Sequence, residues 1–148
     1  RAGAGMTIVQ GCELCQFAAS TVHANEKFSV IFADEANYPG FCRVIWRDHV
    51  REMSDLDQED RLLLNEAVYQ VEQAVRETML PDKINVASLG NVVPHLHWHV
   101  IPRYTDDAHF PSPVWAGAVR ETQAGVLEAR RALLPQLADA IARRMNQG

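Results

Sequence analysis

Residues 95–101 read His95-Leu96-His97-Trp98-His99-Val100-Ile101 and carry the clearest structural pattern in the chain. Histidine recurs at every second position, and apolar side chains fill the positions between and after. A β-strand sends alternate side chains to opposite faces at a rise of roughly 3.3 Å per residue, so neighbouring imidazoles are expected about 6.6 Å apart in one row. The pattern predicts a half-buried strand that packs Leu96, Trp98 and Val100 into a core on its other face.

The imidazole row points to chemistry, because three titratable groups on a half-buried strand are costly to place without partners. Structural histidines held by hydrogen bonds are one interpretation, and a catalytic zinc bound by histidines at alternate positions is another. We favour a third, nucleophilic catalysis. A neutral imidazole can attack phosphorus without a separate base and is a good leaving group afterwards. A neighbouring imidazole could donate a proton to the departing group, and backbone N–H groups of the adjoining turn could hold phosphate oxygens.

The size and composition of the chain predict one compact domain over residues 1–148, since 47% of its side chains are hydrophobic. One interpretation of residues 1–5 is a cloning remnant, with Met6 as the native start. The net charge of −5 and the scattered basic residues argue against a nucleic-acid polymer as partner. No stretch approaches the roughly 20 apolar residues that span a bilayer, and the N-terminus lacks an apolar signal core. Without such a signal, the three cysteines favour a reducing compartment, and we expect the cytoplasm.

The rest of the chain reads as strands, a long helix, strands and a second helix, which favours an α+β fold with an antiparallel sheet. A turn cluster at residues 37–40 separates two β-rich runs. The long helix is expected to start at Ser54 or Asp57 and to stop before Pro81. Strands are expected at 28–33, 41–46, 84–89 and 95–101, a loop at 106–113, and a final helix at about 130–145 with Pro135 near its start or at a kink.

Several motifs together resemble one family. They are the histidine row, the Cys12-Glu13-Leu14-Cys15 segment, the hairpin end Val44-Ile45-Trp46-Arg47-Asp48-His49-Val50 and the ending Ile101-Pro102-Arg103. The row is similar to the motif His-φ-His-φ-His-φ-φ, with φ apolar, of the HIT superfamily of nucleotide hydrolases and transferases, over about residues 12–105. The resemblance implies a HIT-like fold, with a five-stranded antiparallel sheet, one long helix and a C-terminal helix. It also implies a homodimer, because members usually pair about a two-fold axis.

The resemblance implies a role for each histidine of the row. His97 would be the nucleophile that forms a covalent nucleotidyl intermediate on the α-phosphorus, His99 would contact the scissile phosphate or the leaving oxygen, and His95 would orient the site. The implied function is a nucleotide phosphohydrolase that cleaves at a substituted α-phosphate, in a dinucleoside polyphosphate or a nucleoside phosphoramidate, with no organic cofactor. A metal-dependent hydrolase that uses the row, and a nucleotide-binding module without turnover, stay open as alternatives.

Substrate contacts are expected from three further residues. Many relatives carry Gly-Gln-Ser/Thr-Val before the row, whereas this chain has Gly90-Asn91-Val92-Val93. Asn91 could supply the amide donor, but Val92 cannot replace a hydroxyl, so the sequence leaves open whether this change abolishes or redirects activity. Asn85 resembles an asparagine that contacts the nucleotide. Asp34 lies next to the position of a family acidic residue that binds ribose.

The Cys12–Cys15 pair could bind a metal, exchange disulfides or simply pack. The resemblance favours a structural zinc held by Cys12, Cys15, His49 and His95. Cys42 is expected in the core. Three residues after the row are also open: His109 is expected to be a solvated loop histidine, Trp115 could pack on a base, on a dimer mate or as a core anchor, and Arg103 could meet phosphate or an aspartate at 106 or 107.

Overall fold

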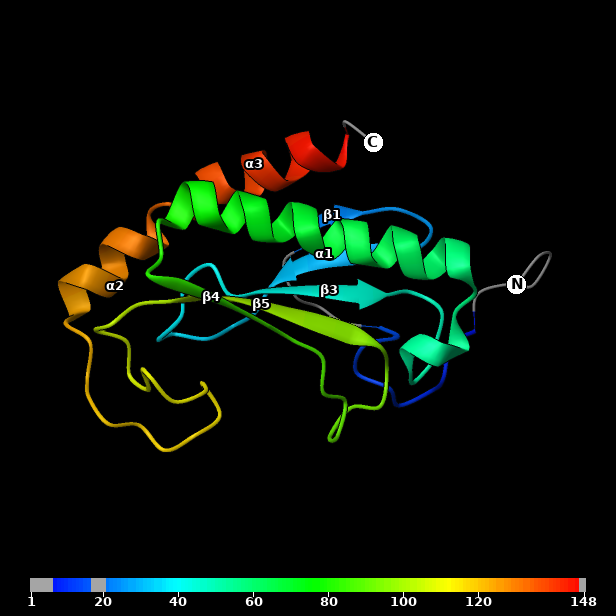
Figure 1. Cartoon of the computed structure of the whole chain (residues 1–148), viewed down its shortest axis with the longest axis horizontal. Helices are drawn as coiled ribbons and strands as arrows, with labels where there is room; N and C mark the ends of the chain where they lie inside the picture. Colours follow the sequence, from blue (N-terminus) through cyan, green and yellow to red (C-terminus); the bar gives the residue numbers. More distant parts are fainter. Residues whose placement is uncertain (1–6, 17–20, 147–148) are drawn as a thin grey trace.

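The computed structural model describes residues 7–16 and 21–146. It contains a five-stranded antiparallel sheet with strand order β1-β2-β3-β5-β4 (Figure 1), which confirms the expected α+β fold. Residues 1–5, interpreted above as a cloning remnant, and Met6 lie outside the described residues. The strands are β1 (Thr21–Ala24), β2 (Phe28–Phe32), β3 (Cys42–Trp46), β4 (Lys83–Ala87) and β5 (His97–Arg103). The helices are η1 (Met53–Asp55), α1 (Gln58–Met79), α2 (Ala124–Arg131) and α3 (Leu134–Met145).

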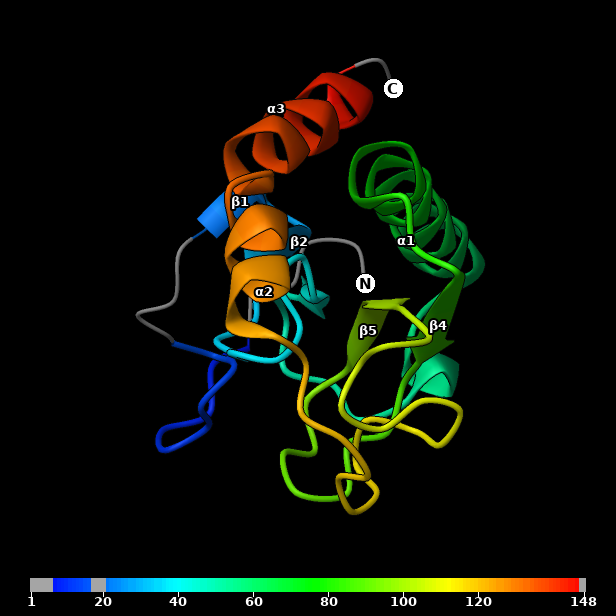
Figure 2. The same ribbon diagram turned by 90° about the vertical axis from the view of Figure 1, so that its left-hand side faces the viewer.

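The sheet has one face under helices and one under loops (Figure 2). α1 and α3 cover the first face, where Val44, Val100 and Leu137 are among the residues of the main core. On the opposite face the N-terminal segment and the connections around β5 pack two smaller clusters, one with Leu14 and Ile45 and one with three residues, Tyr38, Phe41 and Ile101. Cys42 belongs to the main core, as predicted.

Strand β5 is shorter at its start than the histidine pattern suggested. It begins at His97, and it pairs with β3 through Ile45↔His97 and with β4 through Asn85↔Ile101. The expectation of three imidazoles in one strand was therefore wrong for His95. The backbone of the residue after His95 bonds elsewhere: Leu96 N–H donates to the Val50 carbonyl at 2.8 Å, and Trp46 N–H donates to the Leu96 carbonyl at 3.1 Å. Leu96 and Val100 pack in the helix-side core with Trp98 against it, as predicted.

Helix α1 begins and ends where capping chemistry dictates. The Asp57 carboxylate accepts a hydrogen bond from the Asp60 N–H at 2.9 Å, so Asp57 is the N-cap, and Ser54 lies in the short helix η1. At the other end Leu80 adopts a left-handed conformation with φ of 48°, directly before Pro81. The β2–β3 turn packs on this end, because a Cβ added at Gly40 (φ 91°) would come within 3.0 Å of Met79 Cε.

The C-terminal region forms two helices where the sequence indicated one. Pro135 lies in the first turn of α3, where a missing N–H costs nothing, and the chain changes direction between Arg131 and Leu134. Helix α2 has no buried residue. Its sequence therefore has no apolar stripe from which a helix could be predicted. Strand β1, a sheet edge with no fully buried side chain, was missed for the same reason. Among the described residues no helix has the length and apolar character needed to cross a membrane.

We predict that Leu64→Ala lowers the free energy of unfolding by about 2–5 kcal/mol, because it opens a cavity at a fully buried position between α1 and the sheet. Leu62→Ala, two residues earlier on the same helix and 60% exposed, is the matched control and should change it by less than about 1 kcal/mol. Chemical denaturation measures both. Equal losses would show that α1 packs through a different face.

Candidate functional site

The centre of the site is the imidazole of His97, at the start of β5. Its Nδ1 lies 2.6 Å from the backbone carbonyl oxygen of His95. Because a carbonyl can only accept, Nδ1 carries the proton, and Nε2 holds the lone pair. Burial lowers the pKa of His97, and the nearby Arg43 guanidinium lowers it further. The hydrogen bond to the His95 carbonyl raises the pKa but does not outweigh these two effects. At neutral pH the ring is therefore neutral, with a nucleophilic Nε2.

His99 lies one pleat further along β5, surrounded by aromatic rings. Its ring centroid is 4.9 Å from that of His97, 5.5 Å from Phe41 and 5.2 Å from Trp115, all with edge geometry. Burial, with smaller contributions from His97 and Arg43, lowers the pKa of His99 to about 4. Its Nδ1 is buried and has no hydrogen-bond partner among the described residues. The site thus presents a neutral imidazole with an unused ring nitrogen beside the candidate nucleophile.

His95 faces a group of sulfur and nitrogen donors. One ligand atom from each of Cys12, Cys15, His49 and His95 lies within 4.8 Å of all the others. His95 Nδ1 is 3.4 Å from Cys12 Sγ, 3.5 Å from Cys15 Sγ and 3.2 Å from His49 Nδ1. Two thiols and two imidazoles at these separations form a Cys₂His₂ donor set.

The donor set fits a tetrahedral zinc ion. Bonds of about 2.3 Å to sulfur and 2.0–2.1 Å to nitrogen would place neighbouring ligand atoms roughly 3.3–3.8 Å apart, close to the separations above and to the 3.3 Å between Cys15 Sγ and His49 Nδ1. His95 Nε2 lies 2.5 Å from the Trp46 carbonyl and donates to it, so Nδ1 keeps the lone pair that a metal needs. The residues predicted for zinc are therefore brought together with the right free atoms.

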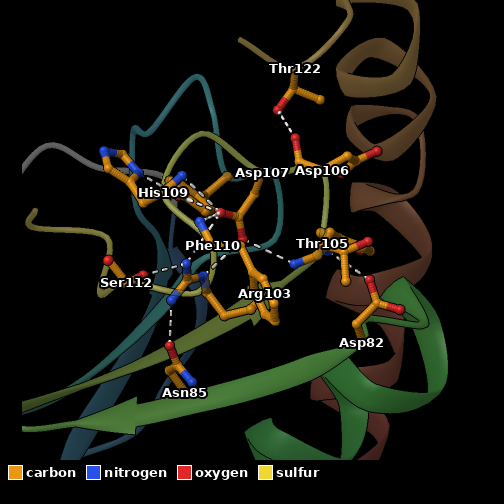
Figure 3. Close-up of polar contacts among 12 residues, drawn as sticks. Asp82, Asn85, Arg103, Thr105, Asp106, Asp107, His109, Phe110, Ser112 and Thr122 are labelled. Carbon is orange, nitrogen blue, oxygen red and sulfur yellow. Dashed lines mark hydrogen bonds and ion pairs between the residues drawn. The ribbon is translucent and has the colours of Figure 1, made fainter. Parts of the chain in front are cut away.

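Arg103 and Asp107 form a buried ion pair beyond the far end of the row (Figure 3). Their side chains are 2% and 0% exposed, and Arg103 Nε donates to Asp107 Oδ2 at 2.8 Å. The guanidinium also donates to Asn85 Oδ1 at 2.6 Å and to the Ser112 carbonyl at 2.7 Å. Burial alone would raise the pKa of Asp107, but hydrogen bonds from Arg103 and from three backbone N–H groups hold it well below its usual value. Of the two roles open for Arg103, the structure shows the aspartate pair.

His109 belongs to this network and is not the solvated loop residue we expected. Its Nδ1 lies 2.6 Å from Tyr38 Oη, and the two rings stack with centroids 5.8 Å apart. The Tyr38 hydroxyl donates to Asp107 Oδ1 at 3.1 Å, which leaves its oxygen to accept from His109. Burial, with the Asp107 charge, raises the pKa of Tyr38 to about 12, so the hydroxyl keeps its proton. The sequence carried no signal for this contact, because Tyr38 and His109 are far apart along the chain.

The three expected substrate-contact residues lie in different settings. Asn85 is on β4, and its carbonyl oxygen already accepts from Arg103. Asn91 is exposed in the turn before His95, beside Val92, which is 92% exposed. Asp34 is exposed just after β2. Among the described residues, the side chains of Asn91 and Asp34 make no hydrogen bond or ion pair with the protein, and their contacts with substrate stay predictions.

Arg43 is a residue of this site that sequence reasoning missed. It lies on β3 directly opposite His99 in the antiparallel pairing, on the face that carries the imidazoles. A polar residue at an alternating strand position normally indicates a solvent-facing side, and nothing local to Cys42-Arg43-Val44 showed that this side would meet the row.

Comparisons with known proteins agree with this arrangement. A family model described as HIT domain matches residues 16–106. A histidine triad protein from Bradyrhizobium japonicum is 29% identical and has a TM-score of 0.68, with 85% of this chain and 90% of that chain covered. One from Marinobacter aquaeolei is 27% identical, with a TM-score of 0.66 and coverage of 83% and 90%. A Zn-bound histidine triad family protein from Mycobacterium smegmatis is 21% identical and shares the fold. Its TM-score is 0.64, with 93% of this chain and 98% of that chain covered. The comparison with curated proteins found no match.

We predict that Asp107→Asn lowers the free energy of unfolding by about 3–5 kcal/mol at pH 7, because it leaves the Arg103 charge buried without a counter-ion. An aspartate in the unfolded chain titrates near 3.9, and the native pKa of Asp107 is lower. Its contribution is therefore complete above about pH 4 and is lost as the pH falls toward the native pKa. Denaturation at several pH values should show this acid loss in the wild type and not in the variant.

The matched control is Asp106→Asn, one residue earlier. Asp106 pairs with Arg130 but is 51% exposed, so its loss should cost less than about 1 kcal/mol. If both variants lost the same stability, the buried pair would not be the anchor of this loop.

Proposed function

Because the chain belongs to the HIT domain family, we propose that it is a nucleotide phosphohydrolase that cleaves at a substituted α-phosphate through a nucleotidyl intermediate on His97. The observation that carries the proposal is the hydrogen bond from His97 Nδ1 to the His95 carbonyl, 2.6 Å long, which leaves Nε2 as the free nucleophilic atom. Nucleophile activation here needs no neighbouring base, since the ring is already neutral.

In the proposed first step, His97 Nε2 attacks the α-phosphorus, and the bond from phosphorus to the leaving group breaks. Charge that develops on His97 is stabilised by the His95 carbonyl at Nδ1–H. In this proposal His99, one pleat away, donates a hydrogen bond to the departing atom, and an amine leaving group takes up a proton from solvent as it departs. In the second step water attacks the phosphorus and releases a proton to solvent, the bond to Nε2 breaks, and a nucleoside monophosphate is released with neutral His97 restored.

The two alternatives differ from this proposal in what they need from the row. A metal-dependent hydrolase needs neighbouring row histidines to share one ion. Among the described residues, the group of side chains close enough to hold a metal is Cys12, Cys15, His49 and His95, which includes neither His97 nor His99. The arrangement therefore favours the nucleophilic mechanism. A binding module without turnover would show the same geometry, so detection of the covalent intermediate is what separates it from an enzyme.

We propose that Cys12, Cys15, His49 and His95 hold a structural zinc ion, as the separations of their ligand atoms support. Bound there, zinc would supply a fixed tetrahedral anchor and no step of the reaction. The four residues would tie the N-terminal segment and the end of the β2–β3 hairpin to the residue whose carbonyl orients His97. We further propose a cytoplasmic homodimer, as the family resemblance implies. β4, with Val86 43% exposed, forms one edge of the sheet available for pairing.

We predict that His97→Ala lowers kcat by at least about a thousandfold and leaves nucleotide affinity within a few fold, because the nucleophile acts after binding. The measurement is turnover of a dinucleoside polyphosphate and of a nucleoside phosphoramidate, together with rapid-quench mass spectrometry for a nucleotide adduct on His97.

His23→Ala is the matched control, because His23 lies on the edge strand β1 against Phe28. It should keep wild-type turnover and the adduct. Normal turnover in His97→Ala would eliminate the covalent mechanism, and bound nucleotide with no adduct in the wild type would favour the binding module.

We predict that the purified wild type contains about one zinc per chain and that Cys12→Ser loses most of it, with a fall in thermal stability larger than the fall in kcat of the protein that remains folded. Elemental analysis and thermal unfolding, with and without a chelator, measure this. Cys42→Ala is the control, since that buried thiol lies in the core and should lower stability while zinc is retained. Wild-type protein free of zinc after metal-replete expression would refute the site and leave the nucleophile untouched.

A further inference from the structure

Arg43 places a positive charge beside the imidazole row. It pairs with His99 across β3 and β5, while the neighbouring residue on the same face, Ile45, pairs with His97. Its guanidinium carbon lies 5.6 Å from the centroid of the Phe41 ring, whose edge contacts His99. The arginine, Phe41 and His99 therefore form one continuous surface at the end of the row away from the Cys₂His₂ donors.

The charge of Arg43 has no protein counter-ion in the described part of the chain. Its side chain makes no ion pair and no hydrogen bond there, and its Nε is buried without a partner. His99 Nδ1, on the residue opposite, is also buried and unpartnered. Buried polar atoms are nearly always paired, because an unpaired one forfeits its hydration. Two such atoms on facing residues of one sheet indicate a place where a polar ligand supplies the missing partners.

Packing alone does not explain this position. The contact with Phe41 stabilises the guanidinium plane but offers nothing to the Nε–H. Arg103, on the same face of β5, shows what a structural arginine looks like in this protein, since Asp107, Asn85 and the Ser112 carbonyl accept from its guanidinium. In contrast to Arg103, Arg43 has a buried Nε–H with no acceptor among the described residues.

We propose that Arg43 binds negative charge on the leaving group, so that the enzyme prefers substrates whose leaving group is a phosphate over those whose leaving group is an amine. This inference rests on the proposed function. In an in-line displacement the attacking atom and the leaving atom lie on opposite sides of the phosphorus. With His97 attacking and His99 facing the leaving atom, the guanidinium opposite His99 lies on the leaving-group side. The exposed turn residue Val92 has no hydroxyl for this task.

The chemistry of the guanidinium suits the assignment. Its planar donors match two phosphate oxygens at once, and it stays charged at every physiological pH. A phosphate leaving group departs with additional negative charge, which Arg43 would neutralise as the bond to phosphorus breaks. An amine leaving group needs a proton and gains nothing from a nearby cation.

The test compares two substrates with the same nucleoside and the same scissile phosphate, a diadenosine polyphosphate and an adenosine phosphoramidate, in the wild type, Arg43→Gln and Arg43→Lys. We expect Arg43→Gln to lower kcat/KM for the polyphosphate by about ten- to a hundredfold, the size of one lost charge-assisted contact, and for the phosphoramidate by less than about threefold. Arg43→Lys should lie between. Arg76→Gln is the matched control, because it removes one positive charge at an exposed position on α1. It should leave kcat/KM unchanged for both substrates.

A binding experiment keeps the inference separate from the proposed function. Calorimetry with AMP and ATP needs no turnover: Arg43→Gln should weaken ATP binding by about tenfold or more and leave AMP binding nearly unchanged. If the wild type cleaves neither substrate, the proposed function fails while this comparison still decides the role of Arg43. Equal losses for AMP and ATP, equal losses for the two substrates, or no loss at all would overturn the leaving-group assignment. Thermal unfolding of Arg43→Gln should match or exceed the wild type, and a marked decrease would overturn it in favour of a structural role.

Discussion

The hydrogen bond from His97 Nδ1 to the backbone carbonyl of His95 is the interaction on which the site depends. It fixes the tautomer of the proposed nucleophile and the direction of its ring at once, so the position of the His95 backbone directs the proposed attack. His95 is held in turn by the Trp46 carbonyl at Nε2 and faces the Cys₂His₂ donors at Nδ1. A single fully buried residue thus connects the candidate metal site and β3 through its side chain and the proposed nucleophile through its backbone carbonyl.

The opposite end of the row is organised by charge. Asp107 receives hydrogen bonds from Arg103 and from the backbone N–H groups of Tyr104, His109 and Phe110, so one carboxylate shapes the start of the loop after β5. That loop continues to Trp115, whose ring meets His99 although it is itself 52% exposed. Because the ion pair is buried and fully bonded, it helps to give this loop a defined course, together with the packing of Val114 against the cluster of Tyr38, Phe41 and Ile101.

How far the sequence could predict this structure differs between elements for physical reasons. The long helix, the central strands and the Cys₂His₂ group follow from periodicity and from a family resemblance, and they were predicted. β1 and α2 lack buried side chains, so their sequences carry no pattern to find. His95 lies outside β5 because the backbone of its neighbour Leu96 forms hydrogen bonds with Val50 and Trp46. These are tertiary contacts, which no local sequence pattern encodes. Arg103 was left open because an arginine after the row suits a phosphate contact as well as an aspartate pair. The expectation of a solvated His109 was wrong because its partner, Tyr38, lies far away along the chain.

The two arginines on the loop-covered face of the sheet differ in the partners of their guanidinium groups. Arg103 is enclosed by acceptors and stabilises the loop after β5, whereas Arg43 keeps an unpaired buried donor at a position that packing alone would fill better with an apolar side chain. Such a position is tolerated only where the surroundings are rigid. β3 and β5 lie at the centre of the sheet, with a core of fully buried aliphatic side chains behind them. The surrounding sheet that tolerates the unpaired Nε–H of Arg43 also holds the guanidinium, His99 and His97 in a fixed arrangement before a ligand binds. Electrostatic stabilisation of a transition state requires such preorganised groups.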